Sequence, residues 1–213
     1  EGFLDVVDIR IPEGMLNPRF DPDPAHCPPV VAGNVEISQR IVDALLRAFG
    51  LAACSQGTMN NVIFGNERVS YYETIAGGEG ATSNRSGASA VHTHMTNTAI
   101  TDPEILEYRF PVRLECFEIR CGSGGKGVHS GGDGVRRRIR FLEPVTISML
   151  MQHRKIAPYG VAGGAPGDVG KQWKIDCVGN QIPLSGNQSL SLEAGESIEI
   201  ETPGGGGFGK CNL

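Results

Sequence analysis

Hydrophobic positions early in the chain recur with the period of an α-helix. They are Ile37, Ile41, Val42, Leu45, Leu46 and Phe49. This spacing places them on one helical face, and Gly50 ends the pattern. Asn34 or Ser38 is a candidate N-cap, because either side chain can accept a bond from a free backbone N–H. The pattern predicts one prominent amphipathic helix that packs its apolar face against the rest of the chain.

After about residue 60 the pattern changes to short β-prone runs separated by glycine clusters. The runs cover residues 61–64, 68–75, 112–120, 135–141, 145–151, 172–178, 189–192 and 197–201. An earlier β-branched run, Phe3–Ile11, is also expected to form a strand. Asp102 and Pro103 suit the N-cap and first position of a short helix. Because the later strands follow one another without intervening helices, we predict an α+β fold with a mixed part over 1–110 and a β-rich part over 111–213.

Composition and charge narrow the class of protein. The 213 residues include 30 glycines and 13 prolines, and 39% are hydrophobic, which favours a folded, loop-rich chain over a helical bundle or a disordered segment. The net charge of −5 provides no field that would hold nucleic acid or anionic lipid. The basic run Arg136–Arg140 is expected to lie on a solvent face or to pair with carboxylates, with phosphate binding as the alternative.

The cysteines and the first residue of the chain give expectations about its cellular compartment and about whether it is part of a longer polypeptide. The six cysteines lack the spacing of a zinc site or a disulfide framework, which suits a reducing, cytoplasmic compartment. The sequence shows neither a signal peptide nor an apolar run of about 18 residues that would cross a membrane. The first residue is Glu1 rather than methionine, which suggests a processed or truncated piece of a longer polypeptide.

The glycine-rich run Gly204–Gly209 requires backbone that adopts unusual dihedral angles or approaches another segment closely. Its spacing to Lys210 matches a phosphate-binding P-loop. Cys211 replaces the magnesium-ligating Ser or Thr, and too few residues follow to form the helix that such a loop needs, so we exclude that interpretation. The earlier run Gly122–Gly127 matches a dinucleotide fingerprint but leads into a second β-prone run, which predicts a loop between strands.

His92 and His94 form the strongest candidate for a chemical site. On a strand the two imidazoles would point to the same face, because side chains alternate. They would then share a metal ion or act as acid and base on one substrate. The structural alternative is that one histidine packs under a loop and the other bonds a backbone carbonyl. Asp102 follows in the sequence and completes the predicted catalytic set.

Three further stretches carry polar groups suited to binding. The loop Cys54–Asn61 either holds a reactive Cys or Ser or uses its hydroxyls and amides to satisfy its own turns. Glu73, on a predicted strand, is either a base or ligand contact or an exposed side chain. The run His153–Lys155 gives its loop positive charge that can bind a carboxylate or phosphate, with a solvated turn as the alternative.

Nine longer motifs together resemble one known family. They are Gly33–Arg40, Ser55–Asn61, Tyr71–Gly78, His92–Thr98, Thr101–Glu107, Gly122–Gly127, Gly131–Gly134, Pro158–Gly160 and Thr202–Gly209. From about residue 30 onward the chain resembles the C-terminal part of the hydantoinase B half of the hydantoinase/oxoprolinase family. Among the members of that family it looks most like the ATP-dependent 5-oxoprolinases.

The resemblance implies ATP-coupled opening of the lactam ring of 5-oxo-L-proline to give L-glutamate, within glutathione turnover. It also implies that a hydantoinase A-type half binds ATP and phosphorylates the amide oxygen, while the B half hydrolyses the activated intermediate. Water attacks such an electrophile when a base and charge stabilisation are supplied. His92 or His94 would be the base, and glycine-rich backbone N–H groups would stabilise the developing anion.

The predicted site therefore has a catalytic set and a substrate-binding set. The catalytic set is His92, His94 and Asp102. The substrate-binding set is Ser55, Asn60, Asn61, Glu73, Asn97, Gly204, Gly205, Gly206 and Gly207. A divalent metal is left open, and ATP is expected outside this chain.

The resemblance also implies partners and limits. The long N-terminal portion of the family's B half, with the segments that hold a metal in related carboxylases, is missing, so the chain alone is expected to be inactive. A hydantoinase A-type domain or subunit and further copies of the chain are the expected partners. The alternatives are a hydantoinase or ATP-dependent ketone carboxylase component, and a segment that only scaffolds or mediates oligomerisation.

Overall fold

The computed structural model describes residues 6–14, 17–27 and 33–211 and divides the chain into two compact units, Glu1–Gly33 and Asn34–Leu213. The described part of the first unit contains a 3-10 turn, Pro24–His26, in which Ala25 N–H donates to the Asp23 side chain at 3.0 Å. The predicted strand Phe3–Ile11 is wrong for residues 6–11, which form no strand. The side chains of Val6 and Ile9 are exposed there, because β-branched residues form a strand only where a partner strand accepts them.

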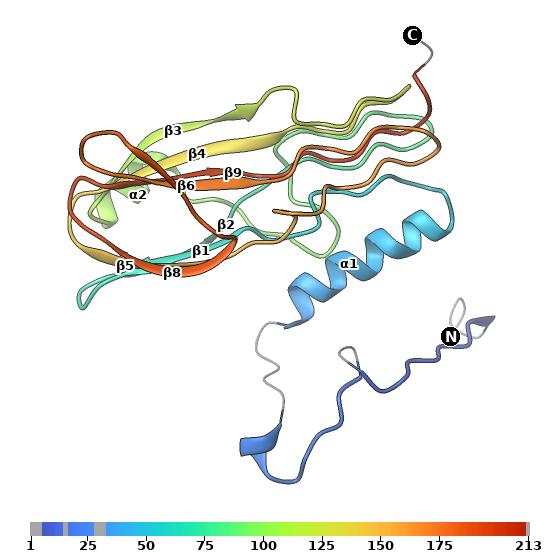
Figure 1. Cartoon of the computed structure of the whole chain (residues 1–213), viewed down its shortest axis with the longest axis horizontal. Helices are drawn as coiled ribbons and strands as arrows, with labels where there is room; N and C mark the ends of the chain where they lie inside the picture. Colours follow the sequence, from blue (N-terminus) through green and yellow to red (C-terminus); the bar gives the residue numbers. More distant parts are fainter. Residues whose placement is uncertain (1–5, 15–16, 28–32, 212–213) are drawn as a thin grey trace. The chain divides into compact units, whose positions relative to one another are not determined.

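The second unit is an α+β fold, as the sequence predicts. Its helices are α1 (Gly33–Ala48) and α2 (Pro103–Arg109). Its strands are β1 (Asn61–Gly65), β2 (Ser70–Thr74), β3 (Val112–Arg120), β4 (Gly134–Phe141), β5 (Val145–Leu150), β6 (Lys171–Ile175), β7 (Gln181–Pro183), β8 (Asn187–Leu192) and β9 (Ser197–Glu201). Two antiparallel sheets result, with strand orders β2-β1-β5-β8 and β3-β4-β9-β6-β7 (Figure 1). The predicted N-cap of α2 is confirmed, since Glu104 N–H donates to Asp102 Oδ1 at 2.9 Å.

The hydrophobic core lies between the two sheets. Along β5, Val145, Ile147 and Met149 are buried, and the residues between them point away from the core, as period-two alternation requires. Phe64 of β1 and Phe141 of β4 meet edge to face with ring centroids 5.2 Å apart. Strands from both sides of residue 110 thus share one core.

A buried ion pair crosses this core from one sheet to the other. Arg137 of β4 donates from Nε and Nη2 to the two carboxylate oxygens of Glu73 of β2, at 2.9 and 3.0 Å. The two side chains are 1% and 3% exposed, and Tyr71 Oη donates to Glu73 Oε2 at 3.0 Å. Glu73 is therefore neither exposed nor free to contact a ligand. The pair is a structural link between the sheets.

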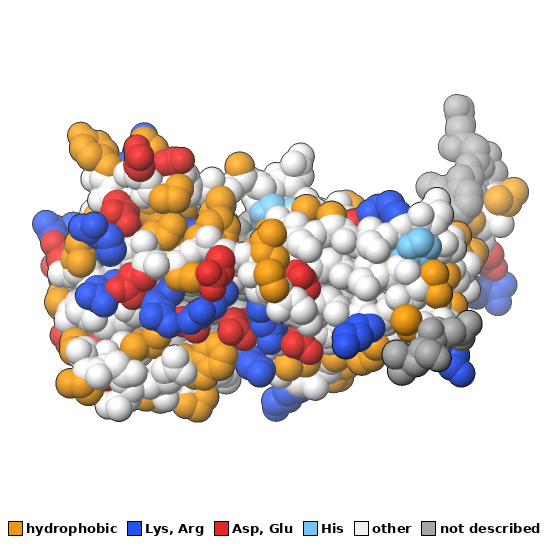
Figure 2. Space-filling model, turned by 90° about the horizontal axis from the view of Figure 1, so that it is seen from above, with side chains coloured by type: hydrophobic (Ala, Val, Ile, Leu, Met, Phe, Trp, Pro, Cys, Tyr) orange, Lys and Arg blue, Asp and Glu red, His pale blue; other side chains and the backbone are white. Residues whose placement is uncertain are grey.

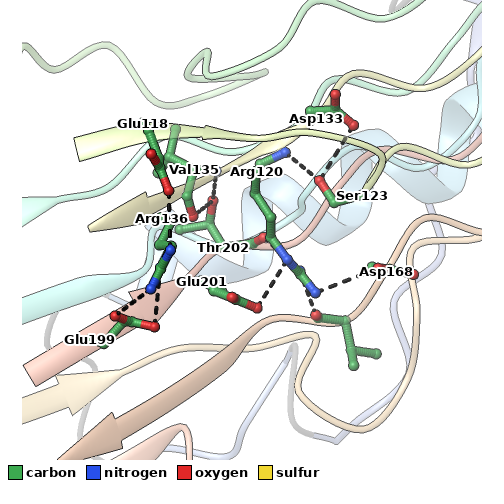
Figure 3. A network of polar contacts seen from close by, with 12 residues as sticks. Glu118, Arg120, Ser123, Asp133, Val135, Arg136, Asp168, Glu199, Glu201 and Thr202 are labelled. Carbon is green, nitrogen blue, oxygen red and sulfur yellow. Dashed lines mark hydrogen bonds and ion pairs between the residues drawn. The ribbon is translucent and has the colours of Figure 1, made fainter. Parts of the chain in front are cut away.

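The other arginines of β4 pair with carboxylates on the outer face of the sheet, which confirms one predicted interpretation of the basic run. Arg136 contacts Glu118 and Glu199, and Arg120 of β3 contacts Glu201 at 3.0 Å (Figure 3). Arg138 shares the Glu199 carboxylate. Figure 2 shows the resulting intermingling of acidic and basic side chains over this half of the molecule.

Helix α1 buries a different face from the one that its hydrophobic pattern predicts. Gln39 and Asp43 are 1% and 3% exposed, whereas Ile41, Leu45 and Phe49 are 43%, 53% and 69% exposed. The polar face turns inward because the adjoining loops present hydrogen-bond partners rather than apolar side chains. The helix begins at Gly33, so Ser38 lies inside it and is not its N-cap, and the side chain of Asn34 lies outside the described set.

Beyond the ends of the strands the chain continues as glycine-rich segments held together by backbone hydrogen bonds (Figure 1). The run Gly204–Gly207 lies among them, and its four N–H groups donate at 2.8 to 3.2 Å to carbonyl oxygens of other segments. Those acceptors are Asp168, Gly132, Cys54 and Ala165. A Cβ atom on Gly205 would lie 2.0 Å from the Glu79 carbonyl oxygen. The glycine run is thus required for close packing of backbones.

Candidate functional site

Two histidines with left-handed backbone flank the inward face of α1. His94 and His153 both have a φ of 53°, and Asn60 has a φ of 46°. Non-glycine residues seldom adopt this conformation, which costs about 1–3 kcal/mol each and is concentrated at functional sites. These three residues converge on the loops that receive the polar face of α1, so we take this region as the candidate site.

The first half of the site is a histidine oriented by a buried carboxylate. His94 Nε2 lies 2.8 Å from Asp43 Oδ1 and donates its hydrogen to it, and Ser55 N–H donates to the same oxygen at 3.1 Å. Asp43 Oδ2 is buried without a hydrogen-bond partner among the described residues. The carboxylate fixes the tautomer of His94 and leaves the Nδ1 lone pair to accept a proton, which is the arrangement of an oriented general base.

The second half of the site is a neutral histidine beside an arginine and a thiol. His153 Nδ1–H donates to Ile156 O at 2.6 Å, so Nε2 accepts from Arg40 Nη1. Burial, with a contribution from the Arg40 charge, lowers the pKa of His153 to about 4. Cys54 Sγ lies 3.7 Å from the same Nε2, and burial followed by the Asp43 charge raises the Cys54 pKa. Cys54 is therefore a protonated thiol here rather than an activated nucleophile.

The buried His153 predicts a loss of stability in mild acid. Its pKa falls from 6.5 in the unfolded chain to about 4 in the folded one, so folding stability is complete above pH 6.5 and is lost as the pH falls toward 4, by about 3 kcal/mol at most. Urea unfolding at pH 7 and pH 4.5 measures this loss. Between these two pH values, His153→Gln should lose less unfolding free energy than the parent chain. His26→Gln, which removes an exposed histidine, should lose as much as the parent chain. An identical pH dependence in all three proteins would contradict the assignment.

A hollow of about 380 Å³ opens beside both halves. Its lining includes Arg40, Asp43, Cys54 and Tyr159. Gly57, with a φ of 55°, allows the two halves to approach, because a Cβ atom there would lie 2.8 Å from Asp43 Oδ2. The hollow gives solvent or a small molecule a place beside Asp43, the carboxylate that orients His94.

The structure separates the predicted catalytic residues. Residues 92–95 do not form a strand, so the predicted shared face of His92 and His94 is wrong. His92 Nε2 lies 3.2 Å from Thr98 Oγ1, and burial lowers its pKa. Asp102 caps α2, and within the described ranges it bonds neither histidine. Of the catalytic set, only His94 belongs to the site around α1.

The predicted substrate-binding residues divide in the same way. Ser55 belongs to the site, and its Oγ accepts Gly80 N–H at 3.0 Å. Asn60 accepts Arg154 Nη1 at 2.9 Å, and Asn61 accepts the Tyr72 hydroxyl at 2.8 Å. Asn97 is exposed. The N–H groups of Gly204, Gly205, Gly206 and Gly207 are occupied by backbone carbonyls, so this run has no free donor for an anion.

Arg40, Asp43 and the role of His153 were not predicted from the sequence. On α1 the residues Glu36, Gln39 and Asp43 follow an i, i+3, i+7 spacing, which marks one face of the helix. That spacing could have indicated that the three polar side chains share a buried face. It did not lead to this prediction, because a polar helix face opposite an apolar one ordinarily faces solvent.

The described residues contain neither a metal-binding cluster nor a membrane-spanning helix. No group of three or more His, Cys, Asp or Glu side chains lies together there in a way that would hold a metal ion. Within the same residues, neither helix combines the length and the apolar character needed to cross a membrane.

The fold of this chain is similar to that of a solved structure. The chain superposes on the ATP-dependent caprolactamase from Pseudomonas jessenii with a TM-score of 0.63 and 22% identity, over 75% of this chain and 30% of that one. The fold is thus one that occurs as a domain within a larger chain. The family model described as Hydantoinase B/oxoprolinase matches residues 1–211, and the chain belongs to this family.

Two relatives are closely similar in sequence. The chain is 48% identical over 209 residues to 5-oxoprolinase 1 of Arabidopsis thaliana, and 48% identical over 211 residues to the 5-oxoprolinase of Dictyostelium discoideum. These alignments cover 98% and 99% of this chain but only 16% of each relative. The predicted resemblance is confirmed, and the chain corresponds to a small part of these longer proteins.

Proposed function

We propose that this chain is the C-terminal-type part of a 5-oxoprolinase, in which ATP hydrolysis is coupled to hydrolytic opening of 5-oxo-L-proline to L-glutamate. The similarity to two proteins named 5-oxoprolinase over nearly the whole chain supports the substrate class. The observation that carries the chemical role is the pair of His94 and buried Asp43 beside a hollow, 2.8 Å apart. A hydrolytic step needs a base held in one tautomer, and this pair supplies it.

In this proposal His94 Nδ1 takes a proton from the attacking water, and Asp43 stabilises the imidazolium that forms. The His94 side chain is 13% exposed, so its ring is not closed off from solvent. Ser55 supports this geometry, because its N–H donates to Asp43 Oδ1 and its Oγ accepts Gly80 N–H. We assign the base to His94 alone, since among the described residues neither His92 nor Asp102 contacts Asp43.

The remaining parts of the reaction lie outside this chain in the proposal. ATP is bound by a hydantoinase A-type domain or subunit, which activates the lactam oxygen. The assembled enzyme is an oligomer in the cytoplasm, in keeping with six free cysteines. The chain without that partner is expected to be inactive toward 5-oxo-L-proline.

Activity of the longer protein tests the proposal. With wild-type sequence in this part, ATP and 5-oxo-L-proline should yield L-glutamate, and His94→Ala should lower kcat by at least about a hundredfold, since the base is lost. His92→Ala is the matched control in the same loop and should retain most of the activity. Unchanged glutamate formation in His94→Ala would overturn the catalytic role and favour a purely structural segment.

The runner-up within the family is a hydantoinase or an ATP-dependent ketone carboxylase component. The same longer protein, given hydantoin or a ketone with bicarbonate in place of 5-oxo-L-proline, separates these activities. Turnover of 5-oxo-L-proline alone is the expected result. Preferential turnover of either other substrate would replace the substrate assignment and leave the role of His94 in place.

A further inference from the structure

The arginines of the sheets differ in their partners from three basic side chains near α1. On the sheets, Arg120, Arg136, Arg137, Arg138 and Arg140 each have a carboxylate within ion-pair distance. Arg40, Arg154 and Lys155 have no such partner among the described residues. Arg40 and Arg154 are only partly exposed, so each places a charge within the fold without a neutralising carboxylate.

These three cations line one hollow of about 450 Å³. The hollow is also lined by His153, Ser185 and Asn187, and its lining contains neither Asp nor Glu. Arg154 and Lys155 additionally border an adjoining hollow of about 310 Å³ that includes Lys171 and is likewise without acidic side chains. The His153 imidazole is neutral, and its Nε2 accepts from Arg40, so it positions that guanidinium without cancelling its charge.

Arg154 is held in place entirely by neutral acceptors. Its Nε donates to Gln172 Oε1 at 2.7 Å, and its Nη1 donates to Asn60 Oδ1 at 2.9 Å and to Gln152 O at 2.6 Å. Its Nη2 reaches only the Met151 sulfur at 3.0 Å. Thioether sulfur is a weak acceptor, so Nη2 retains hydrogen-bonding capacity. Burial lowers the Arg154 pKa to about 9, and Glu36 opposes that shift from a distance without an ion pair.

The backbone makes room for this arginine at two glycines. A Cβ atom on Gly170 would lie 2.5 Å from Arg154 Cζ, and one on Gly186 would lie 2.9 Å from Arg154 Cγ. Together with its four neutral partners, this packing fixes the guanidinium at the wall of the hollow. A fixed, partly desolvated guanidinium without a counter-ion favours an oxyanion such as a carboxylate or phosphate.

We propose that the hollow lined by Arg40, Arg154 and Lys155 is a binding site for a small oxyanion, either a carboxylate or inorganic phosphate. The alternative for the loop His153–Lys155 is a solvated turn. The identification of the carboxylate with that of 5-oxo-L-proline or L-glutamate rests on the proposed function. The oxyanion site itself rests only on the side chains described above.

Calorimetric titration of the chain tests the site without measuring turnover. The ligands are inorganic phosphate, 5-oxo-L-proline and L-glutamate at fixed ionic strength, with 2-pyrrolidinone as the matched lactam that lacks a carboxylate. At least one oxyanion should bind and 2-pyrrolidinone should not. Arg154→Gln should weaken that binding by at least about tenfold, and Lys155→Ala by about threefold.

Lys126→Ala removes an exposed charge outside the hollow and is the control, with no change expected. Lys155 is also exposed, so Lys155→Ala keeps the test valid if Arg154→Gln does not fold. Absence of binding by all three anions, equal binding of 2-pyrrolidinone, or equal losses in Lys126→Ala and Lys155→Ala would each overturn the proposal. Phosphate binding alone would assign the site to phosphate. Oxyanion binding in a protein that does not open 5-oxo-L-proline would reject the proposed function and keep the site.

Discussion

The Gly205→Ala variant is expected to lose more than about 4 kcal/mol of folding free energy or to fail to fold. The added Cβ would lie 2.0 Å from Glu79 O, 2.3 Å from Glu79 C and 2.7 Å from Gly80 N. All three are backbone atoms in a segment bonded on several sides, since Gly132 N–H donates to Glu79 O at 2.8 Å. Neither the Gly205 segment nor the Glu79 segment can move away without breaking hydrogen bonds to neighbouring segments. Urea unfolding followed by circular dichroism measures the change.

Gly179→Ala is the matched control for this substitution. Gly179 has a φ of 94° and has nothing within 4 Å of its added Cβ, so only backbone strain of about 1 kcal/mol is expected. Equal losses in the two variants would show that conformational strain, rather than close packing, governs the glycine segments. A Gly205→Ala protein with parental stability would contradict the packing of the whole glycine-rich region.

Glu73→Gln is expected to destabilise the fold by about 3–5 kcal/mol, because it leaves the Arg137 guanidinium buried without its counter-charge. The pair is 1% and 3% exposed and joins β4 of one sheet to β2 of the other. Arg137 Nη1 has no partner among the described residues even in the parent chain, so the loss of Glu73 cannot be relieved locally. The same urea unfolding measures this loss.

Two companion variants sharpen that prediction. The double variant Glu73→Leu/Arg137→Met should recover most of the lost stability, because replacing both partners with apolar groups removes the unpaired charge. Glu143→Gln removes the carboxylate of the exposed Arg68–Glu143 pair and should leave the stability close to that of the parent chain, because solvent screens this pair. A double variant as unstable as Glu73→Gln would show that the loss comes from packing rather than from charge.

Much of the fold follows from local sequence. The predicted runs 112–120 and 197–201 coincide with β3 and β9, and Asp102 caps α2 as expected. These elements depend on alternation, β propensity and capping, which neighbouring residues determine. The short strand β7 was missed, because three exposed residues carry no alternation and pair only where β6 lies beside them.

The site was harder to predict, for a physical reason that His94 illustrates. Its residue type suggested acid–base chemistry, but its partner Asp43 is 51 residues away and its φ of 53° removes it from any strand. His92, two residues earlier, bonds Thr98 instead. Period-two alternation predicts the direction of neighbouring side chains only where the backbone is a regular strand. The backbone around His94 is a turn, so alternation does not apply there.

The sequence by itself determined the α+β class, the position of nearly every strand, the need for bare backbone near the C-terminus and the family. Only the tertiary structure decided which face of α1 is buried, that Glu73 pairs with Arg137 across the core, and that Arg40, Arg154 and Lys155 line one hollow. Secondary structure responds to contacts over a few residues. Burial of a charge or an amide depends on partners that only the folded chain brings within hydrogen-bond distance.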